Sequence, residues 1–171
     1  MTQFTFDPAH SSIEFQVKHL MVSKVKGSFT QFNVELSGDL DDLSSLKGSA
    51  SIDVKSIDTN QADRDNHLRT SDFFDADNYP EVKFEIKEVT KDKVTGDLTI
   101  KGVTNEETFD YDFGGVIKNP QNDTNVAGFT VSGKVDREKY GMSFNQTLET
   151  GGVLIGNDVK FEASLEFEVK N

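Results

Sequence analysis

The sequence predicts an all-β fold: one domain over residues 1–171 that forms an eight-stranded antiparallel β-barrel. Most segments alternate apolar and polar side chains with a period of two, which is typical of strands with one buried and one solvated face. The connections between these segments are mostly short, as in an antiparallel meander. A two-sheet sandwich would show the same alternation, but closing one sheet removes its exposed edges. The interior of an eight-stranded barrel is either filled or able to hold one small ligand.

Eight segments alternate in this way, and we predict a strand for each. In chain order they are Ser12–Leu20, Val25–Ser37, Leu46–Val54, Glu81–Val89, Val94–Ile100, Thr108–Gly114, Ala127–Val135 and Val159–Val169. In the second strand, Gly27 and the out-of-phase Phe29 predict a bulge or a sharp bend, as barrels need at corners. Small residues such as Gly48, Gly96 and Gly133 on the apolar faces favour a cavity over a filled core, although glycines also relieve curvature.

The first interruption of the alternation lies between the third and fourth predicted strands. Residues Asp63–Phe74 place two Arg, one His and several carboxylates ahead of a Phe-Phe pair, and a short helix fits them. Thr59 or Asn60 is the expected N-cap. Arg64 and His67 then share a helix face with Leu68 and Ser71, because residues three and four apart are neighbours. We expect this helix to close one end of the barrel.

The second interruption is a long loop, Asp136–Gly152, between the seventh and eighth strands. It contains Arg137, while Arg64 and Arg69 lie in the first interruption. We expect one or more of these arginines to bind a polar or phosphate headgroup; the alternative for each is pairing with a nearby carboxylate, Asp63, Asp65, Asp72 or Asp136. His19, at the apolar end of its strand, is either a core histidine with satisfied hydrogen bonds or a polar contact at the end of a cavity.

Composition excludes several classes of protein. With 35% hydrophobic and 28% charged residues the chain is globular, and its net charge of −12 argues against nucleic acid or an anionic membrane surface as partner. The absence of Cys excludes disulfides and thiolate chemistry. No stretch has the length of a membrane span. The start, Met1–Thr5, has no basic region followed by an apolar run, so we expect a cytoplasmic protein.

The residues carry no recognisable catalytic or metal-binding motif. His10, His19 and His67 lack the paired spacings of metal ligands, and neither a G-x-S-x-G elbow nor a glycine-rich phosphate loop is present. The absence of Trp argues against a sugar cleft, whereas 14 Phe suit a dry interior or an ordinary Phe-rich core. We therefore predict no enzyme, no metal and no cofactor. Two alternatives stay open: a lipid-directed hydrolase or isomerase that uses His19 or His67, and a filled-core stress or interaction protein.

Four groups of motifs, in the same order along the chain, resemble the YceI-like family. They are Asp7–Ile13 with Phe15, Val17 and His19; Arg64–Arg69 with Asp72–Phe74 and Pro80; Gly96–Thr104; and Asp136–Arg137 with Tyr140–Met142 and Gly151–Gly152 ahead of Val159. Together these motifs span the whole chain, and the combination is specific although each piece alone is weak. Thr70 stands where relatives often have Ser, and many relatives carry an export signal that this sequence lacks.

The resemblance implies a lipocalin-like barrel that encloses a long amphiphilic lipid such as a polyisoprenoid, an isoprenoid quinone or a similar molecule, for carriage, storage or sensing. It also implies a homodimer. The lipid tail would lie along the interior with the headgroup near His19, Arg64 and His67. The predicted ligand-binding residues are Ile13, Phe15, Val17, His19, Phe29, Arg64, His67, Phe73, Phe74, Phe84, Leu98, Phe129, Met142, Phe144 and Phe161.

Overall fold

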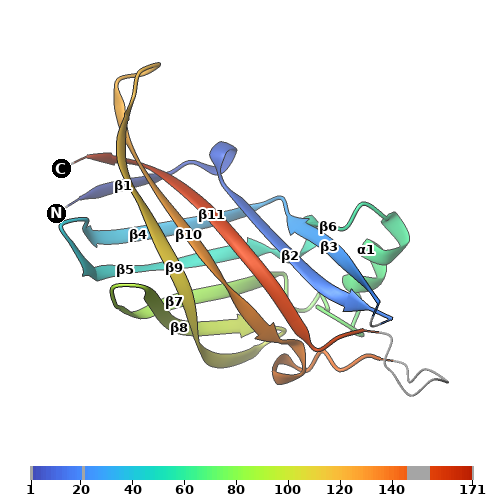
Figure 1. Ribbon diagram of the computed structural model, residues 1–171. Coiled ribbons are helices and arrows are strands. Elements are labelled where there is room, and N and C mark those ends of the chain that lie inside the picture. Colours follow the sequence, from blue (N-terminus) through green and yellow to red (C-terminus); the bar gives the residue numbers. More distant parts are fainter. Residues whose placement is uncertain (1, 21, 146–154, 171) are drawn as a thin grey trace.

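The computed structural model describes residues 2–20, 22–145 and 155–170, and they form one curled antiparallel sheet (Figure 1). Its strands are β1 (Gln3–Phe6), β2 (Ser12–His19), β3 (Ser23–Phe29), β4 (Phe32–Asp39), β5 (Asp42–Asp53), β6 (Ile57–Asp58), β7 (Glu81–Val89), β8 (Lys93–Ile100), β9 (Val103–Asn119), β10 (Thr124–Asp136) and β11 (Asp158–Lys170). The helices are α1 (Ala62–Leu68) and three short 3₁₀ turns, η1 (Pro8–His10), η2 (Val54–Ser56) and η3 (Arg137–Tyr140). The predicted all-β antiparallel barrel class is confirmed.

The order of the strands explains how the sheet curls. Hydrogen-bonded neighbours run β4-β5-β7-β8-β9-β10-β11-β2-β3-β6, and β1 pairs with β11. β1 also lies beside β4, where the backbone N–H of Thr2 donates to the carbonyl oxygen of Gly38 at 3.0 Å. This contact brings the first strand of the path back toward β11, so the inward faces of opposite strands meet around a shared interior.

The strand count differs from the prediction in detail. The segment Val25–Ser37, expected as one strand, is two: β3 pairs with β2 and β4 pairs with β5. Between them the chain turns a corner, where the N–H of Thr30 donates to the carbonyl of Ser56 at 3.2 Å. Phe29 is therefore out of phase because its strand ends there, and of the two predicted alternatives the chain has the sharp bend and not the bulge.

Glycines on the inward faces make room for rings and not for empty space. A Cβ on Gly96 would lie 2.6 Å from the Phe84 ring, and one on Gly133 would lie 2.6 Å from the Phe109 ring. These distances are far below van der Waals contact, so each ring occupies the volume that a larger residue would need. The argument that small residues there leave a cavity is thus wrong at these two positions.

The N-cap of helix α1 differs from both predicted residues, Thr59 and Asn60. Gln61 is the N-cap, and its side-chain oxygen accepts from the N–H of Arg64 at 2.5 Å. Thr59 does not cap the helix because its hydroxyl and its N–H both donate to the Asp65 carboxylate. Asn60 has a φ of 64°. In the described part of the chain, no helix combines the length and the apolar character needed to cross a bilayer.

Candidate functional site

A cavity of about 80 Å³ lies inside the barrel. Its lining is aliphatic and aromatic and comes from seven strands: Val34, Leu36, Leu46, Ile86, Val89, Val94, Tyr111, Phe129, Val131, Leu165 and Phe167. The hydroxyl of Tyr111 donates to the carbonyl oxygen of Thr90 at 2.6 Å and is thereby satisfied within the protein. Such a lining offers apolar contact and no free polar partner, so it suits a hydrocarbon group.

Several inward side chains around this cavity are incompletely buried. Val34, Leu36, Ile86, Val131 and Leu165 are half-buried although their strand faces point into the barrel. A close-packed core would bury such residues fully. The side chains in this half of the barrel therefore leave the cavity of about 80 Å³ unfilled.

Three phenylalanines lie beyond the lining of the cavity, on the side toward α1. The centroids of Phe84 and Phe109 lie 5.7 Å apart, and those of Phe109 and Phe161 lie 4.7 Å apart with perpendicular rings. Along their strands Phe84 and Phe109 each stand two residues before a lining residue, Ile86 and Tyr111 respectively. We call Phe84, Phe109 and Phe161 the aromatic plug, because their rings lie between the cavity and the α1 end.

Two further ring clusters lie at the α1 end. In one, Phe29 contacts Phe15 at 5.4 Å and Phe74 at 5.9 Å between centroids. The other is formed by His67, Phe73 and Phe144, whose centroids are 5.0–5.3 Å apart.

His67 is the polar member of the second cluster. Its Nε2 lies 2.9 Å from the Oδ2 of Asp72, and about half of each side chain is exposed. The cluster therefore presents an imidazole–carboxylate pair on an aromatic base.

Buried polar side chains hold η3 against this end of the barrel. The Tyr140 hydroxyl donates to Oε2 of Glu107 at 2.6 Å, and burial together with this bond raises the pKa of Tyr140. The guanidinium of Arg137 donates to the carbonyl oxygens of Met142 at 2.6 Å and Gly156 at 2.9 Å, and burial lowers its pKa. Arg137 is thus a backbone clamp and not a free anion-binding group.

The predicted ligand residues gather mostly at the α1 end. Phe129 lines the cavity, and Phe84 and Phe161 belong to the aromatic plug. The two ring clusters contain Phe15, Phe29, Phe73, Phe74, Phe144 and His67. Ile13 and Leu98 are buried in the core.

The remaining predicted residues lie at the margins. Val17 stands opposite Val25 on β3, and His19 forms an isolated bridge with Ile155. Met142 is buried next to η3.

Arg64, expected near a headgroup, is engaged within its own segment. Its Nε donates to Oγ1 of Thr59 at 2.7 Å and its Nη2 to the Thr59 carbonyl oxygen at 2.5 Å. The guanidinium therefore fixes the approach to α1 through Thr59, and not through the carboxylates expected as its alternative partners. Its predicted role at a headgroup stays a prediction.

Most of the cavity lining was missing from the predicted set. Leu46, Val89, Val94 and Phe167 are buried around the cavity, yet none was proposed as a ligand contact. Alternation indicated the inward faces of Leu46, Val94 and Phe167 correctly, but not that of Val89, which follows a register shift between Ile86 and Glu88. It carries no information on how far along the barrel a residue lies, so it could not separate the cavity from the plug.

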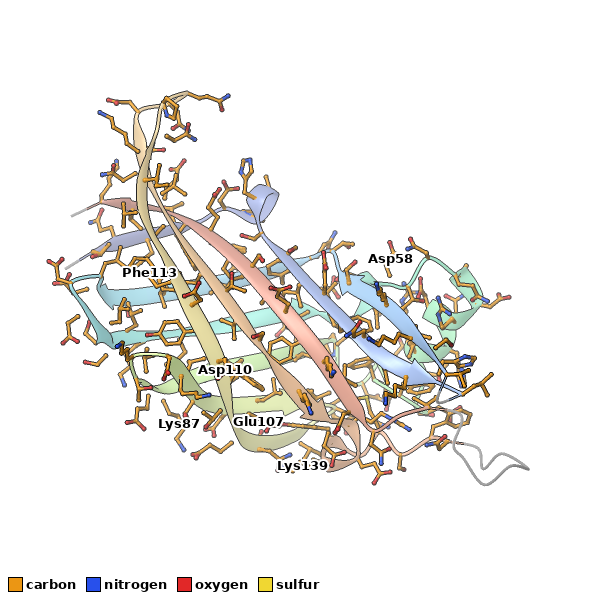
Figure 2. All side chains as sticks on the ribbon, in the orientation of Figure 1. Asp58, Lys87, Glu107, Asp110, Phe113 and Lys139 are labelled. Carbon is orange, nitrogen blue, oxygen red and sulfur yellow. The ribbon has the colours of Figure 1, made fainter. Side chains whose placement is uncertain are left out.

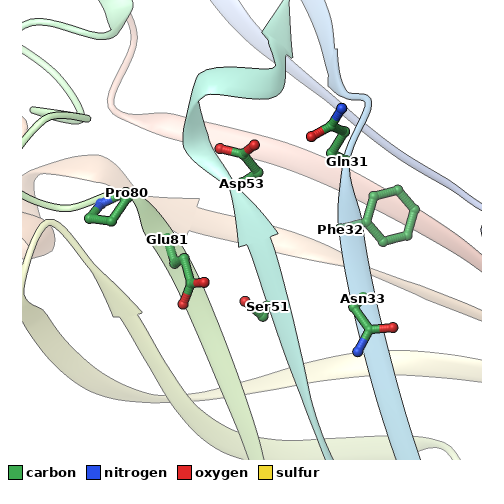
Figure 3. Close-up of a pocket in the computed structure, with 7 residues that line it drawn as sticks. All are labelled: Gln31, Phe32, Asn33, Ser51, Asp53, Pro80 and Glu81. Carbon is green, nitrogen blue, oxygen red and sulfur yellow. The ribbon is translucent and has the colours of Figure 1, made fainter.

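Two polar features lie outside the barrel interior: an open hollow and a cluster of charged side chains. The hollow, of about 300 Å³, lies at β4, β5 and β7. Its lining residues, labelled in Figure 3, are Gln31, Phe32, Asn33, Ser51, Asp53, Pro80 and Glu81. The Asp53 carboxylate there caps η2 by accepting from the N–H of Lys55 at 3.0 Å. At η1, Nδ1 of His10 lies 2.7 Å from Oδ2 of Asp7 and 3.4 Å from Oε2 of Glu166.

These features define the class of protein: a curled antiparallel β-barrel of the lipocalin-like kind with an apolar interior. The YceI-like domain model matches residues 4–167, and the chain therefore belongs to the YceI-like family. A UPF0312 protein of Staphylococcus aureus is 61% identical over 169 residues, which is 99% of each chain. A UPF0312 protein of Staphylococcus epidermidis is 58% identical over the full length of both chains.

Solved structures agree with this assignment. A Campylobacter jejuni YceI protein matches with a TM-score of 0.74 at 31% identity over 100% of both chains. Burkholderia cenocepacia BcnA matches with a TM-score of 0.78 at 22% identity, over 95% of this chain and 99% of that one. A polyisoprenoid binding domain from Saccharophagus degradans matches with a TM-score of 0.71 at 13% identity, over 99% and 100%. The latter two show the fold alone.

Proposed function

We propose that this protein binds a long-chain amphiphilic lipid, such as a polyisoprenoid or an isoprenoid quinone, with its tail inside the barrel. The observation that carries the proposal is the cavity lined only by aliphatic and aromatic side chains from seven strands. The Saccharophagus degradans domain of the same fold is described as polyisoprenoid binding, which supports the same ligand class here. Carriage, storage or sensing would each use this binding step.

The size of the cavity sets a condition on this proposal. Its volume of about 80 Å³ accommodates a few carbon atoms, whereas pockets for drug-sized ligands hold roughly 300–1,000 Å³. A long tail must therefore displace the rings of Phe84, Phe109 and Phe161. Turning these rings aside would join the cavity to the α1 end, where His67 and His19 are the candidate contacts for a headgroup.

Tail length should govern affinity. Burying several hundred Å² of tail at roughly 25 cal/mol per Å² contributes on the order of 10 kcal/mol. Association costs of about 4–15 kcal/mol offset much of this. Binding measured over a series of isoprenoid chain lengths should therefore weaken with every unit removed. Unchanged affinity after removal of one unit would contradict burial of the tail.

A variant that fills the cavity tests its location. Val131→Phe places a ring in the hollow, and we expect lipid retained through purification, quantified by solvent extraction and mass spectrometry, to fall at least about tenfold. Overpacking should cost about 1–3 kcal/mol of stability, so folding is checked by urea unfolding. Val116→Phe is the matched control, because Val116 is 47% exposed on β9. Equal retention by both variants would place the ligand elsewhere.

A second candidate function rests on the pair formed by His67 and Asp72. An imidazole 2.9 Å from a carboxylate is an arrangement that general acid–base catalysis uses, so a lipid-directed hydrolase or isomerase is the alternative. Replacing His67 by Gln separates the two functions. A binding protein should retain its lipid and show no turnover in either form, whereas an enzyme should lose turnover and keep the lipid.

We also propose that the protein is a cytoplasmic homodimer, as expected from the sequence and the family. Light scattering of the purified protein tests the dimer, and cell fractionation tests the location.

A further inference from the structure

Charge is distributed unevenly over this acidic chain. From Phe15 to Val34 the sequence has no Asp or Glu and three lysines, Lys18, Lys24 and Lys26. Because this stretch contributes +3 to a net charge of −12, the rest of the chain carries −15. The stretch forms the β2–β3 hairpin and the start of β4, so the sequence segregation becomes a basic surface in the fold.

The cross-strand register enlarges this surface. Lys18 lies directly opposite Lys24 on the outer face, and Lys134 of β10 lies directly opposite Lys160 of β11. Lys160 is in turn opposite Gln16, which is opposite Lys26. We call Lys18, Lys24, Lys26, Lys134 and Lys160 the lysine patch. Acidic pairs border it on both sides of Lys134 and Lys160: Glu162 lies opposite Glu14, and Asp136 lies opposite Asp158.

The lysines of the patch differ from those on the outer face of β7, β8 and β9. On the outer face of β7, β8 and β9, Lys87 pairs with Glu106 at 2.8 Å and Lys93 pairs with Asp110; Figure 2 labels Lys87 and Asp110 there. Among the described residues, no lysine of the patch forms an ion pair. Like charges directly opposite each other destabilise a sheet, so the fold gains nothing from this arrangement.

Apolar side chains stand at the tip of the same hairpin. Val22 is 87% exposed and Leu20 is 39% exposed. Leu20 also has a φ of 53°, a conformation that residues with a branched side chain rarely adopt and that favours Gly or Asn. The turn therefore holds a leucine where folding alone would prefer a smaller or more polar residue, and it directs apolar groups outward.

We propose that the β2–β3 hairpin docks this protein on an anionic lipid bilayer. Basic residues around exposed apolar groups suit an interface in which the lysines meet anionic headgroups and the apolar tip enters the acyl boundary. The carboxylates that border the patch reduce its positive charge, whereas acidic residues further than about 8 Å away are screened at physiological ionic strength. The hairpin tip lies at the same end of the barrel as α1 (Figure 1). Docking would thus bring that end to the membrane, whatever ligand the interior takes.

Vesicle sedimentation of the full chain tests this proposal. We expect binding to vesicles of phosphatidylcholine mixed with phosphatidylglycerol, weak binding to phosphatidylcholine alone, and loss of binding at high salt. Lys18→Gln, Lys24→Gln and Lys26→Gln together should weaken binding by roughly a hundredfold, at about fivefold per lysine near an anionic surface. Val22→Ser, at an exposed position that folding does not need, should weaken binding several-fold with little change in its dependence on salt.

The matched control removes the same charge from exposed positions elsewhere, as Lys91→Gln, Lys139→Gln and Lys170→Gln together. It should bind the mixed vesicles as the unmodified protein does. Equal loss in both triple variants would overturn the proposal, because net charge and not the hairpin would then control binding. Patch-dependent binding to heparin without binding to vesicles would also overturn it, since the patch would then serve a soluble polyanion. Neither outcome bears on the lipid in the interior, which extraction measures separately.

Discussion

The hydroxyl of Tyr140 donates a hydrogen bond of 2.6 Å to the carboxylate of Glu107, and the tyrosine is fully buried. Glu107 stands on β9 and Tyr140 ends η3, so this bond attaches the 3₁₀ turn to the sheet. Tyr140→Phe keeps the ring and removes the donor from a carboxylate. We expect a loss of about 1–3 kcal/mol in the free energy of unfolding, measured with urea. Tyr79→Phe, at an exposed tyrosine, should change it by less than about 0.5 kcal/mol.

The same tyrosine predicts a loss of stability in alkali. Burial and the bond to Glu107 raise the pKa of Tyr140 above its ordinary value of 10.0. A group whose pKa is raised on folding contributes stability below its unfolded pKa and loses it as the pH rises further. The free energy of unfolding should therefore fall above pH 10, and less steeply in Tyr140→Phe. Identical slopes in the two proteins would contradict this assignment. Part of the slope should persist in the variant because burial also raises the pKa of Tyr111.

Replacing Arg137 by lysine should destabilise the protein. Its guanidinium reaches the carbonyl oxygens of Met142 and Gly156 from different nitrogens, and a lysine ammonium cannot take both positions. Arg137→Lys should cost about 2–3 kcal/mol, because a buried carbonyl loses a charged donor. The measurement is urea unfolding. The conservative exchange Lys91→Arg at an exposed site is the control, and a cost as small as that of the control would show that the clamp contributes nothing.

Gly133 should resist even a methyl group. Its Cβ would lie 2.6 Å from Cδ1 of Phe109, so Gly133→Ala must push the ring aside. We expect a loss of about 1–3 kcal/mol by thermal or urea unfolding. Adding Phe109→Leu should make the double variant more stable than the sum of the single changes predicts, because the smaller side chain removes the clash. Additive changes would show that Gly133 is needed for its backbone conformation and not to avoid a clash with the Phe109 ring.

His10 should titrate above its ordinary pKa of 6.5, because its hydrogen bond to Asp7 favours the charged ring, and the same bond lowers the pKa of Asp7 below 3.8. The pair therefore stabilises the fold most between these two values. The contribution is lost as the pH rises through the folded pKa of His10, and also as it falls through that of Asp7. An NMR titration should show the pKa of His10 falling in Asp7→Asn. The His67 resonance is an internal control, and an unchanged pKa for His10 would contradict the pairing.

Local periodicity accounts for most of what the sequence predicted correctly. Inward residues such as Phe84 and Phe129 lie where alternation places them, since the side-chain period of a strand is two. Motifs at several points along the chain identified the family correctly before any contact was known. The predicted N-cap at Thr59 was wrong, because the Thr59 hydroxyl donates to the carboxylate of Asp65, six residues away, and does not start the helix.

The sequence by itself determined the all-β class, the antiparallel arrangement of the strands, the family and the apolar face of most strands. All of these follow from contacts between residues close in the chain or from ordered motifs. Only the tertiary structure decided that Phe109 fills the space above Gly133, that a hollow remains beside Val131, and that Lys134 faces Lys160 on the outer surface. Each of these depends on the register between strands and on the curl of the sheet, which bring distant residues together.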